Sequence, residues 1–174
     1  MMALDSIFVM FVILFAIVGA ARGWAKELLV SFSVILALAL IHLLERYIPS
    51  TLNLPGLWLF WLRIIILLFL VFFGYQTVVS IPRLAAKATR EKLQDTISGF
   101  IFGGINGYLV AGTILYYMYV AGYPFKKIII PPTDPDLVNR VNNMMMYMPP
   151  QLLGEPLIYF AVILAFIFVI VVYI

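Results

Sequence analysis

The strongest constraint on this chain is a series of long apolar runs with too few charges between them to cover a water-soluble surface. Of its 174 residues, 65% are hydrophobic and 11% are charged, and the mean hydropathy is +1.11. Soluble domains carry about 25% charged residues. Because backbone polar groups in lipid must be satisfied internally, a membrane-embedded run of this kind should be helical. We therefore predict an all-α integral membrane protein.

Five apolar runs are present, at residues 6–21, 28–44, 57–81, 96–123 and 157–174. They predict about five transmembrane helices, joined in places by short interfacial amphipathic helices. Asp5 is the only charged side chain before the first run, whereas a secretory signal would carry Lys or Arg there. We therefore expect this run to stay as a membrane anchor. The expected organisation is a four-helix membrane domain at 1–122, an outer loop at 123–156 and a fifth transmembrane helix at 157–174.

The orientation is predicted from basic residues near the ends of the runs. With the N-terminus outside, six fall on the inner side, at Arg22, Lys26, Arg83, Lys87, Arg90 and Lys92. Four fall on the outer side, at Arg46, Lys126, Lys127 and Arg140. The balance favours an outer N-terminus and a cytoplasmic C-terminus.

The segment GAARGWAKELL, residues 19–29, predicts the tight inner turn of the first hairpin. Glu27 falls in the first turn of the second helix, where the helix dipole favours an anion. It can also pair with Arg22 across the turn.

A second charge lies within an apolar run, since Arg63 is nearly two turns inside the third. A charge at that depth must reach the headgroups or find a partner. Asp5 and Glu45 are the carboxylates expected at the same end. We interpret the neighbouring His42 as an interfacial polar group rather than a proton relay.

Glycines recur in the fourth run, in the segment SGFIFGGINGYLVAG. Gly99, Gly103 and Gly107 are four residues apart, and Gly104 and Gly112 lie beside that line. Small residues at this spacing let another backbone approach closely, so we predict a helix-packing ridge. The alternative is a path for an ion or small solute, with Asn106 as its polar group.

Two amphipathic segments are candidates for contact with lipid or a partner. In residues 82–94 the basic side chains Arg83, Lys87 and Arg90 recur at helical spacing, as in a helix on an anionic leaflet. A plainer interpretation is an ordinary cytoplasmic linker that follows the positive-inside rule. A third interpretation is a binding site for a specific partner.

The other amphipathic segment lies in the outer loop, where Asp134 can cap a helix and Pro135 suits its first position. One apolar face follows, formed by Leu137, Val141, Met144, Met145 and Met148. We expect this face to lie on the membrane or on a neighbouring protein. Thioethers can also bind Cu(I), but no His or Cys supports such a site here.

Known catalytic motifs are missing: the sequence holds no HExxH, GxSxG, Walker or dinucleotide-binding pattern. One histidine and no cysteine leave no evident nucleophile or acid–base set. We expect no enzyme activity, cofactor or metal. The net charge of +3 is dispersed, so we also expect no nucleic-acid partner.

Two of these segments together resemble the colicin V production protein (CvpA) family. The first is an acidic residue before the first helix, followed by Arg-Gly and a glutamate; the second is an aspartate before a glycine-rich fourth helix. The residues that carry the resemblance are Asp5, Arg22, Gly23, Glu27, Asp95, Gly99, Gly103 and Gly107. It covers about residues 1–122. The resemblance implies a small bacterial inner-membrane protein, linked by name to export of a peptide toxin.

The chain departs from that family in two respects. Members often carry a basic residue where this chain has Asn106, and typical members have four helices. We interpret the added outer helix and fifth run as an adaptation to a partner. The function expected is that of an accessory subunit of a larger membrane complex, in contact with lipids and other subunits. The alternative is a free-standing protein that assists transport, secretion or envelope maintenance, for which a homo-oligomer packed through the glycine face is allowed.

Overall fold

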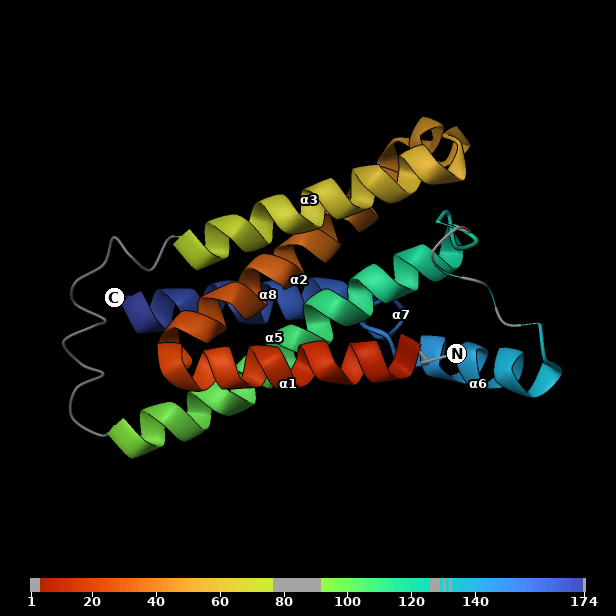
Figure 1. Cartoon of the computed structure of the whole chain (residues 1–174). Coiled ribbons are helices and arrows are strands. Elements are labelled where there is room, and N and C mark those ends of the chain that lie inside the picture. Colours follow the sequence, from red (N-terminus) through yellow and green to blue (C-terminus); the bar gives the residue numbers. More distant parts are fainter. Residues whose placement is uncertain (1–3, 77–91, 126–128, 130, 132, 174) are drawn as a thin grey trace.

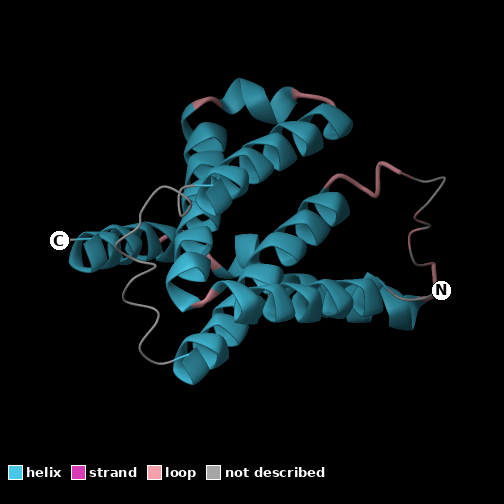
Figure 2. Cartoon of the chain, turned by 60° about the vertical axis from the view of Figure 1, so that its left-hand side comes forward, coloured by secondary structure: helices cyan, strands magenta, loops and turns pink. Residues whose placement is uncertain are grey.

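The computed structural model describes residues 4–76, 92–125, 129, 131 and 133–173 of the chain, and the regular elements among them are all helical (Figures 1 and 2). In chain order they are α1 (Leu4–Arg22), α2 (Trp24–Tyr47), the 3-10 helix η1 (Pro49–Asn53), α3 (Gly56–Gln76), α5 (Lys92–Val120), α6 (Pro135–Met146), α7 (Pro149–Leu152) and α8 (Leu157–Tyr173). The predicted all-α class is confirmed.

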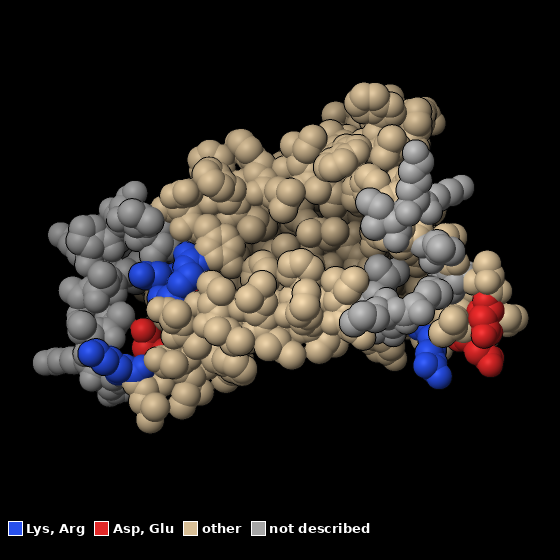
Figure 3. Space-filling view, in the orientation of Figure 1, with Lys and Arg blue, Asp and Glu red and all other residues tan. Residues whose placement is uncertain are grey.

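Three helices, α2, α3 and α5, are long and apolar enough to cross a membrane. Two shorter apolar helices, Ser6–Arg22 and Leu157–Phe168, accompany them. On the face drawn in Figure 3 the charged side chains gather at the two ends, and the middle is uncharged. This distribution suits a protein whose middle lies in lipid and whose ends meet water. Five complete spans remain a prediction.

A single glycine separates α1 from α2. Gly23 has a φ of 88°, in the region that glycine adopts without steric penalty. Its backbone carbonyl still accepts from the N–H of Glu27 at 3.3 Å, so α2 begins immediately after it. The predicted tight turn is therefore confirmed, and it reverses the chain within one residue.

The glycines of α5 pack against α1, and the two helices lie side by side (Figure 1). A Cβ atom added to Gly19 would lie 2.6 Å from the Cα of Gly103, and one added to Gly103 would meet the carbonyl oxygen of Phe15. A Cβ on Gly107 would lie 2.8 Å from the Cα of Val12. The backbones are thus in direct contact, as predicted for a ridge of small residues.

The centre of the bundle is apolar and is formed by α2, α3 and α5. Val30, Val34 and Leu67 have no exposed surface, and Leu109 and Leu115 of α5 are also buried. The outward sides of α1, α3 and α8 expose large apolar side chains, which suits a lipid-facing surface.

The segment after α5 folds back on this core. Asp134 caps α6 as predicted, accepting at 3.0 Å from the N–H of Asp136, and Pro135 opens the helix. The helix ends at Met146, and Pro149 and Pro150 begin the short helix α7.

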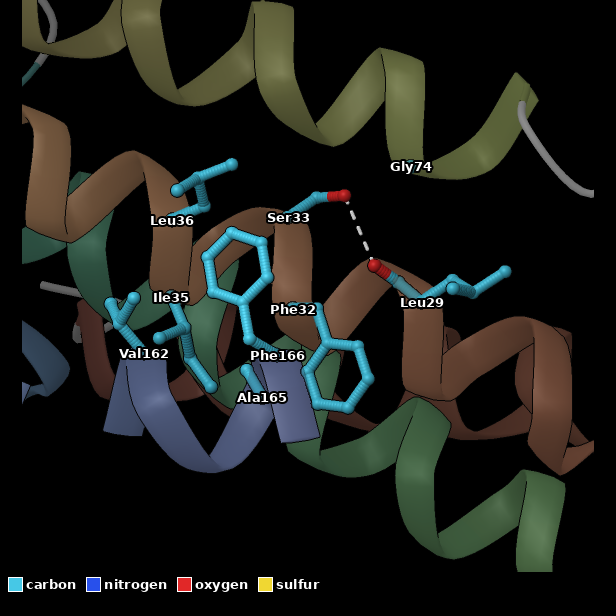
Figure 4. Close-up of a pocket in the computed structure, with 9 residues that line it drawn as sticks. All are labelled: Leu29, Phe32, Ser33, Ile35, Leu36, Gly74, Val162, Ala165 and Phe166. Carbon is cyan, nitrogen blue, oxygen red and sulfur yellow. Dashed lines mark hydrogen bonds between the residues drawn. The ribbon is translucent and has the colours of Figure 1, made fainter. Parts of the chain in front are cut away.

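The last helix, α8, packs chiefly on α2 and extends away from the other helices in Figure 2. Phe32 and Phe168 meet edge to face, with ring centroids 5.7 Å apart. An apolar cavity of about 180 Å³ lies between α2, α3 and α8 (Figure 4). Gly74 of α3 faces Ser33 of α2 beside it, and a Cβ there would lie 2.8 Å from the Cβ of Ser33.

Two neighbouring glycines of α5 provide a matched test of this packing. Gly103→Ala should lower the free energy of unfolding by about 1–3 kcal/mol, because the new methyl meets backbone that cannot move aside. Gly104→Ala should be neutral or mildly stabilising, since its methyl would lie 3.6 Å from the Cβ of Ala16, an ordinary contact. Reversible denaturation in mixed micelles measures both. Equal effects of the two changes would contradict the packing described here.

Candidate functional site

A group of buried and partly buried polar side chains lies where the first hairpin turns. It consists of Arg22 from α1, Glu27 and Ser31 from α2, Tyr75 from α3 and Asn106 from α5, and we call it the turn-end cluster. Each of the helices α1, α2, α3 and α5 contributes a side chain to it. The cluster therefore depends on the whole bundle.

Glu27 is the centre of the turn-end cluster and has no exposed surface. Its Oε1 accepts from Nη1 of Arg22 at 3.0 Å, and its Oε2 accepts from Nδ2 of Asn106 at 2.8 Å. The pairing of Glu27 with Arg22 across the turn is thus confirmed. Both carboxylate oxygens are bonded, which reduces the large cost of burying an ionised group.

Asn106 uses both ends of its amide. Its Nδ2 also donates to the backbone carbonyl of Glu27 at 2.8 Å, and its Oδ1 accepts from Oγ of Ser31 at 2.6 Å. Asn106 is fully buried, and Ser31 is nearly so. Asn106 therefore ties the middle of α5 to the first two turns of α2. The structure gives it a clear role as the polar partner of Glu27.

Arg22 connects the cluster to α3. Its guanidinium lies over the ring of Tyr75, 4.1 Å from the centroid, and its side chain is 23% exposed. Stacking on an aromatic face stabilises an arginine cation that is partly removed from water. Arg22 is thus the one member of the ion pair that reaches the surface.

Asp95 holds the start of α2 from the side of α5. Its Oδ1 accepts from the backbone N–H of Trp24 at 3.1 Å, a free donor at the N-terminus of that helix. A Cβ on Gly23 would lie 2.6 Å from Oδ2 of Asp95. Position 23 therefore requires glycine for two reasons: its φ is positive, and the carboxylate of Asp95 lies too close for a Cβ atom.

The family-motif residues predicted from the sequence mostly come together here. The structure gathers Arg22, Gly23, Glu27, Asp95, Gly99, Gly103 and Gly107 along the contact between the first hairpin and α5. Asp5 lies in the first turn of α1, at the far end of that helix. Gly104 contacts Ala16, and Gly112 packs against Pro149 of α7.

The second buried charge has the partner expected. Nε of Arg63 donates to Oε1 of Glu45 at 2.6 Å, and the guanidinium lies 4.8 Å from the ring centroid of Tyr117. We call this end of the bundle, opposite the turn, the Arg63 end. Pairing with Glu45 is one of the two outcomes predicted for a charge at this depth.

A further polar contact at the Arg63 end was missed from the sequence. Oε1 of Glu155, in the loop before α8, accepts from Nε2 of His42, from Arg46 and from the hydroxyl of Tyr159. These bonds lower the pKa of Glu155 to about 2, and the hydrogen bond from His42 makes the largest contribution. The spacing of His42 and Arg46 places them on one face of α2, but nothing local indicates a partner more than a hundred residues away.

The predicted contact surfaces have different outcomes. Arg83, Lys87 and Arg90 lie outside the described residues. On α6 and just after it, Met145 and Met148 are buried by the chain itself, and Val141 and Met144 pack against the same core. Leu137 is 37% exposed. Contact of this face with lipid or a partner stays a prediction, and the chain's own core occupies much of it.

The fold and the cluster define a class of protein: a multi-pass membrane protein whose apolar helices enclose a small ionised network. Residues 4–133 match the family model described as colicin V production protein. This match covers well over half of the chain, so the chain belongs to that family. The family and the apolar helices indicate a multi-pass protein of the bacterial inner membrane. Comparisons with curated proteins and with solved structures found no match.

A double-mutant cycle tests whether Asn106 is present to satisfy Glu27. Asn106→Leu alone should lower the free energy of unfolding by about 1–3 kcal/mol or more, because it leaves a buried carboxylate oxygen without its donor. In a Glu27→Leu background the same change should be markedly less damaging. Denaturation in mixed micelles measures the coupling. Thr113→Val serves as the control, since among the described residues that buried hydroxyl bonds only to the Leu109 carbonyl of its own helix. Additive effects of the two leucine substitutions would contradict the assignment.

Proposed function

We propose that this CvpA-family protein is a non-catalytic accessory subunit that acts by binding other membrane proteins. The observation that carries the proposal is α8. This helix lies outside the region matched by the family model, and most of its described side chains are exposed. The large exposed ones are Leu157, Tyr159, Phe160, Ile163, Leu164, Phe166, Ile167, Ile170 and Val171.

The position of α8 supports a role in contact rather than in holding the bundle together. The helix packs chiefly on α2, through residues such as Ile158 and Ala165, which are buried. Its base is fixed by Glu155, which accepts from two side chains of α2. A helix that is anchored on one side and apolar on the other offers a preformed surface to a second membrane protein.

The chemistry of the turn-end cluster also supports a non-catalytic role. Glu27 has both oxygens engaged, one by Arg22 and one by Asn106. A general base needs an accessible lone pair within reach of a substrate proton. A carboxylate that is fully buried and bonded on both sides suits a structural tie better.

Site-specific photo-crosslinking in intact cells tests this proposal. A photoreactive residue at Phe160 or Leu164 should give a discrete adduct with the same membrane protein at both positions. The control position is Ile13 of α1, also exposed but within the family-matched region, where that adduct should be missing. Mass spectrometry identifies the adduct. Lipid adducts alone at all three positions, with a pure oligomer of this chain on purification, would contradict the accessory role.

The second candidate is a free-standing protein that assists transport, secretion or envelope maintenance. It is favoured by the turn-end cluster, because ionisable groups inside a membrane bundle commonly mark a transport path. Against it, the buried face of α2 between Ser31 and Glu45 is apolar, with Val34, Leu38 and Ile41 all nearly sealed. A path through this arrangement would need α2 to separate from its neighbours.

A further inference from the structure

A polar cavity lies at the Arg63 end, apart from the turn-end cluster. It has a volume of about 150 Å³ and is lined by residues of α2, α3, α5 and the α7 region. The polar part of its wall comes from His42, Glu45, Arg63, Tyr116 and Tyr117. By contrast, the cavity between α2, α3 and α8 and a further cavity between α1 and α5 are lined almost wholly by apolar side chains.

Arg63 brings unused hydrogen-bond donors to this cavity. The residue is only 7% exposed, and its Nε donates to Glu45. Within the described part of the chain, its two η nitrogens donate no hydrogen bond, although a guanidinium carries five N–H groups. A guanidinium that is mostly removed from water gains stability when its remaining donors find partners. The cavity is the space into which a partner for them can enter.

The opposite wall offers acceptors. Oε1 of Glu45 accepts from Arg63, while its Oε2 accepts nothing from the described residues, and the side chain is 25% exposed. The hydroxyl of Tyr117 likewise has no hydrogen bond among these residues. The cavity thus presents a cation and an anion that are hydrogen-bonded to each other at 2.6 Å, and their formal charges cancel.

This pairing of charges restricts the ligand. A simple anion at Arg63 would be repelled by Glu45, and a simple cation at Glu45 would be repelled by Arg63. A molecule that carries both an acidic group and an ammonium group satisfies both sides. A cavity of about 150 Å³ has room for a small polar group but not for a large ligand.

We propose that this cavity binds a small zwitterion with an acidic group and a primary ammonium, the chemistry of phosphoethanolamine. The acidic oxygens accept from the η nitrogens of Arg63, and the ammonium donates to Glu45. The group can arrive as the headgroup of phosphatidylethanolamine, because Glu45 lies two residues before the end of α2, or as a free molecule.

Lipid binding to the purified full-length chain tests the proposal. Native mass spectrometry would compare phosphatidylethanolamine with phosphatidylglycerol, which has the phosphate without the ammonium, and with phosphatidylcholine, whose quaternary ammonium donates no hydrogen bond. Wild type should bind phosphatidylethanolamine about tenfold more tightly than either of the other two lipids. One charge-assisted hydrogen bond accounts for a difference in affinity of about this size. Glu45→Gln should lose that preference, whereas Lys92→Gln, exposed at the other end of α5, should keep it.

Competition with free O-phosphoethanolamine distinguishes a lipid headgroup from a soluble molecule as the ligand. Competition by the free compound at millimolar concentration, together with a rise in thermal stability that Glu45→Gln abolishes, would assign the site to a soluble zwitterion. A preference for the lipid without such competition would assign it to the headgroup. Equal binding of the three lipids with no effect of the free compound overturns the proposal, as does a preference that Glu45→Gln leaves unchanged. The comparison of the three lipids on wild type can overturn the proposal by itself, so the test stands even if Glu45→Gln fails to fold.

Discussion

The backbone contact between α1 and α5 is the interaction on which the other features depend. Gly19 and Gly103 approach so closely that neither position has room for a Cβ atom. In lipid no hydrophobic force draws two apolar helices together, so such contacts rest on close van der Waals packing and on hydrogen bonds. The same approach brings Asp95 to the start of α2 and Asn106 to Glu27. A wider separation would leave the turn-end cluster without Asn106 and the start of α2 without Asp95.

The two buried ion pairs are satisfied in different ways. Glu27 is sealed and uses both oxygens, within reach of a helix N-terminus that favours an anion. Arg63 is nearly sealed, lines a cavity and pairs with a carboxylate that is partly open. The first arrangement holds helices together. In the second, donors of Arg63 have no partner among the described residues, and for that reason it suits a ligand.

Local sequence patterns predicted much of this structure, because each depends on neighbouring residues. Glycines four apart indicated a close helix contact, and a charge inside an apolar run needed a partner, which proved to be Glu45. The sequence could not show which helix meets the glycines or that Asn106 bonds to Glu27, since periodicity defines a face and not its neighbour. It also missed the bonds of Glu155 and the folding of Met145 onto the chain's own core, because both depend on packing between distant segments.

Disulfide formation between α1 and α5 tests the central contact most directly. The chain has no cysteine, so Ala16→Cys with Gly104→Cys adds the only two thiols. A Cβ at position 104 would lie 3.6 Å from that of Ala16, within the range of about 3.5–4.5 Å found in disulfides. Oxidation of native membranes should therefore close a bond within one chain, detected as loss of labelling by a maleimide polymer on a denaturing gel. Free thiols after oxidation, or bonds formed only between two chains, would contradict the helix contact.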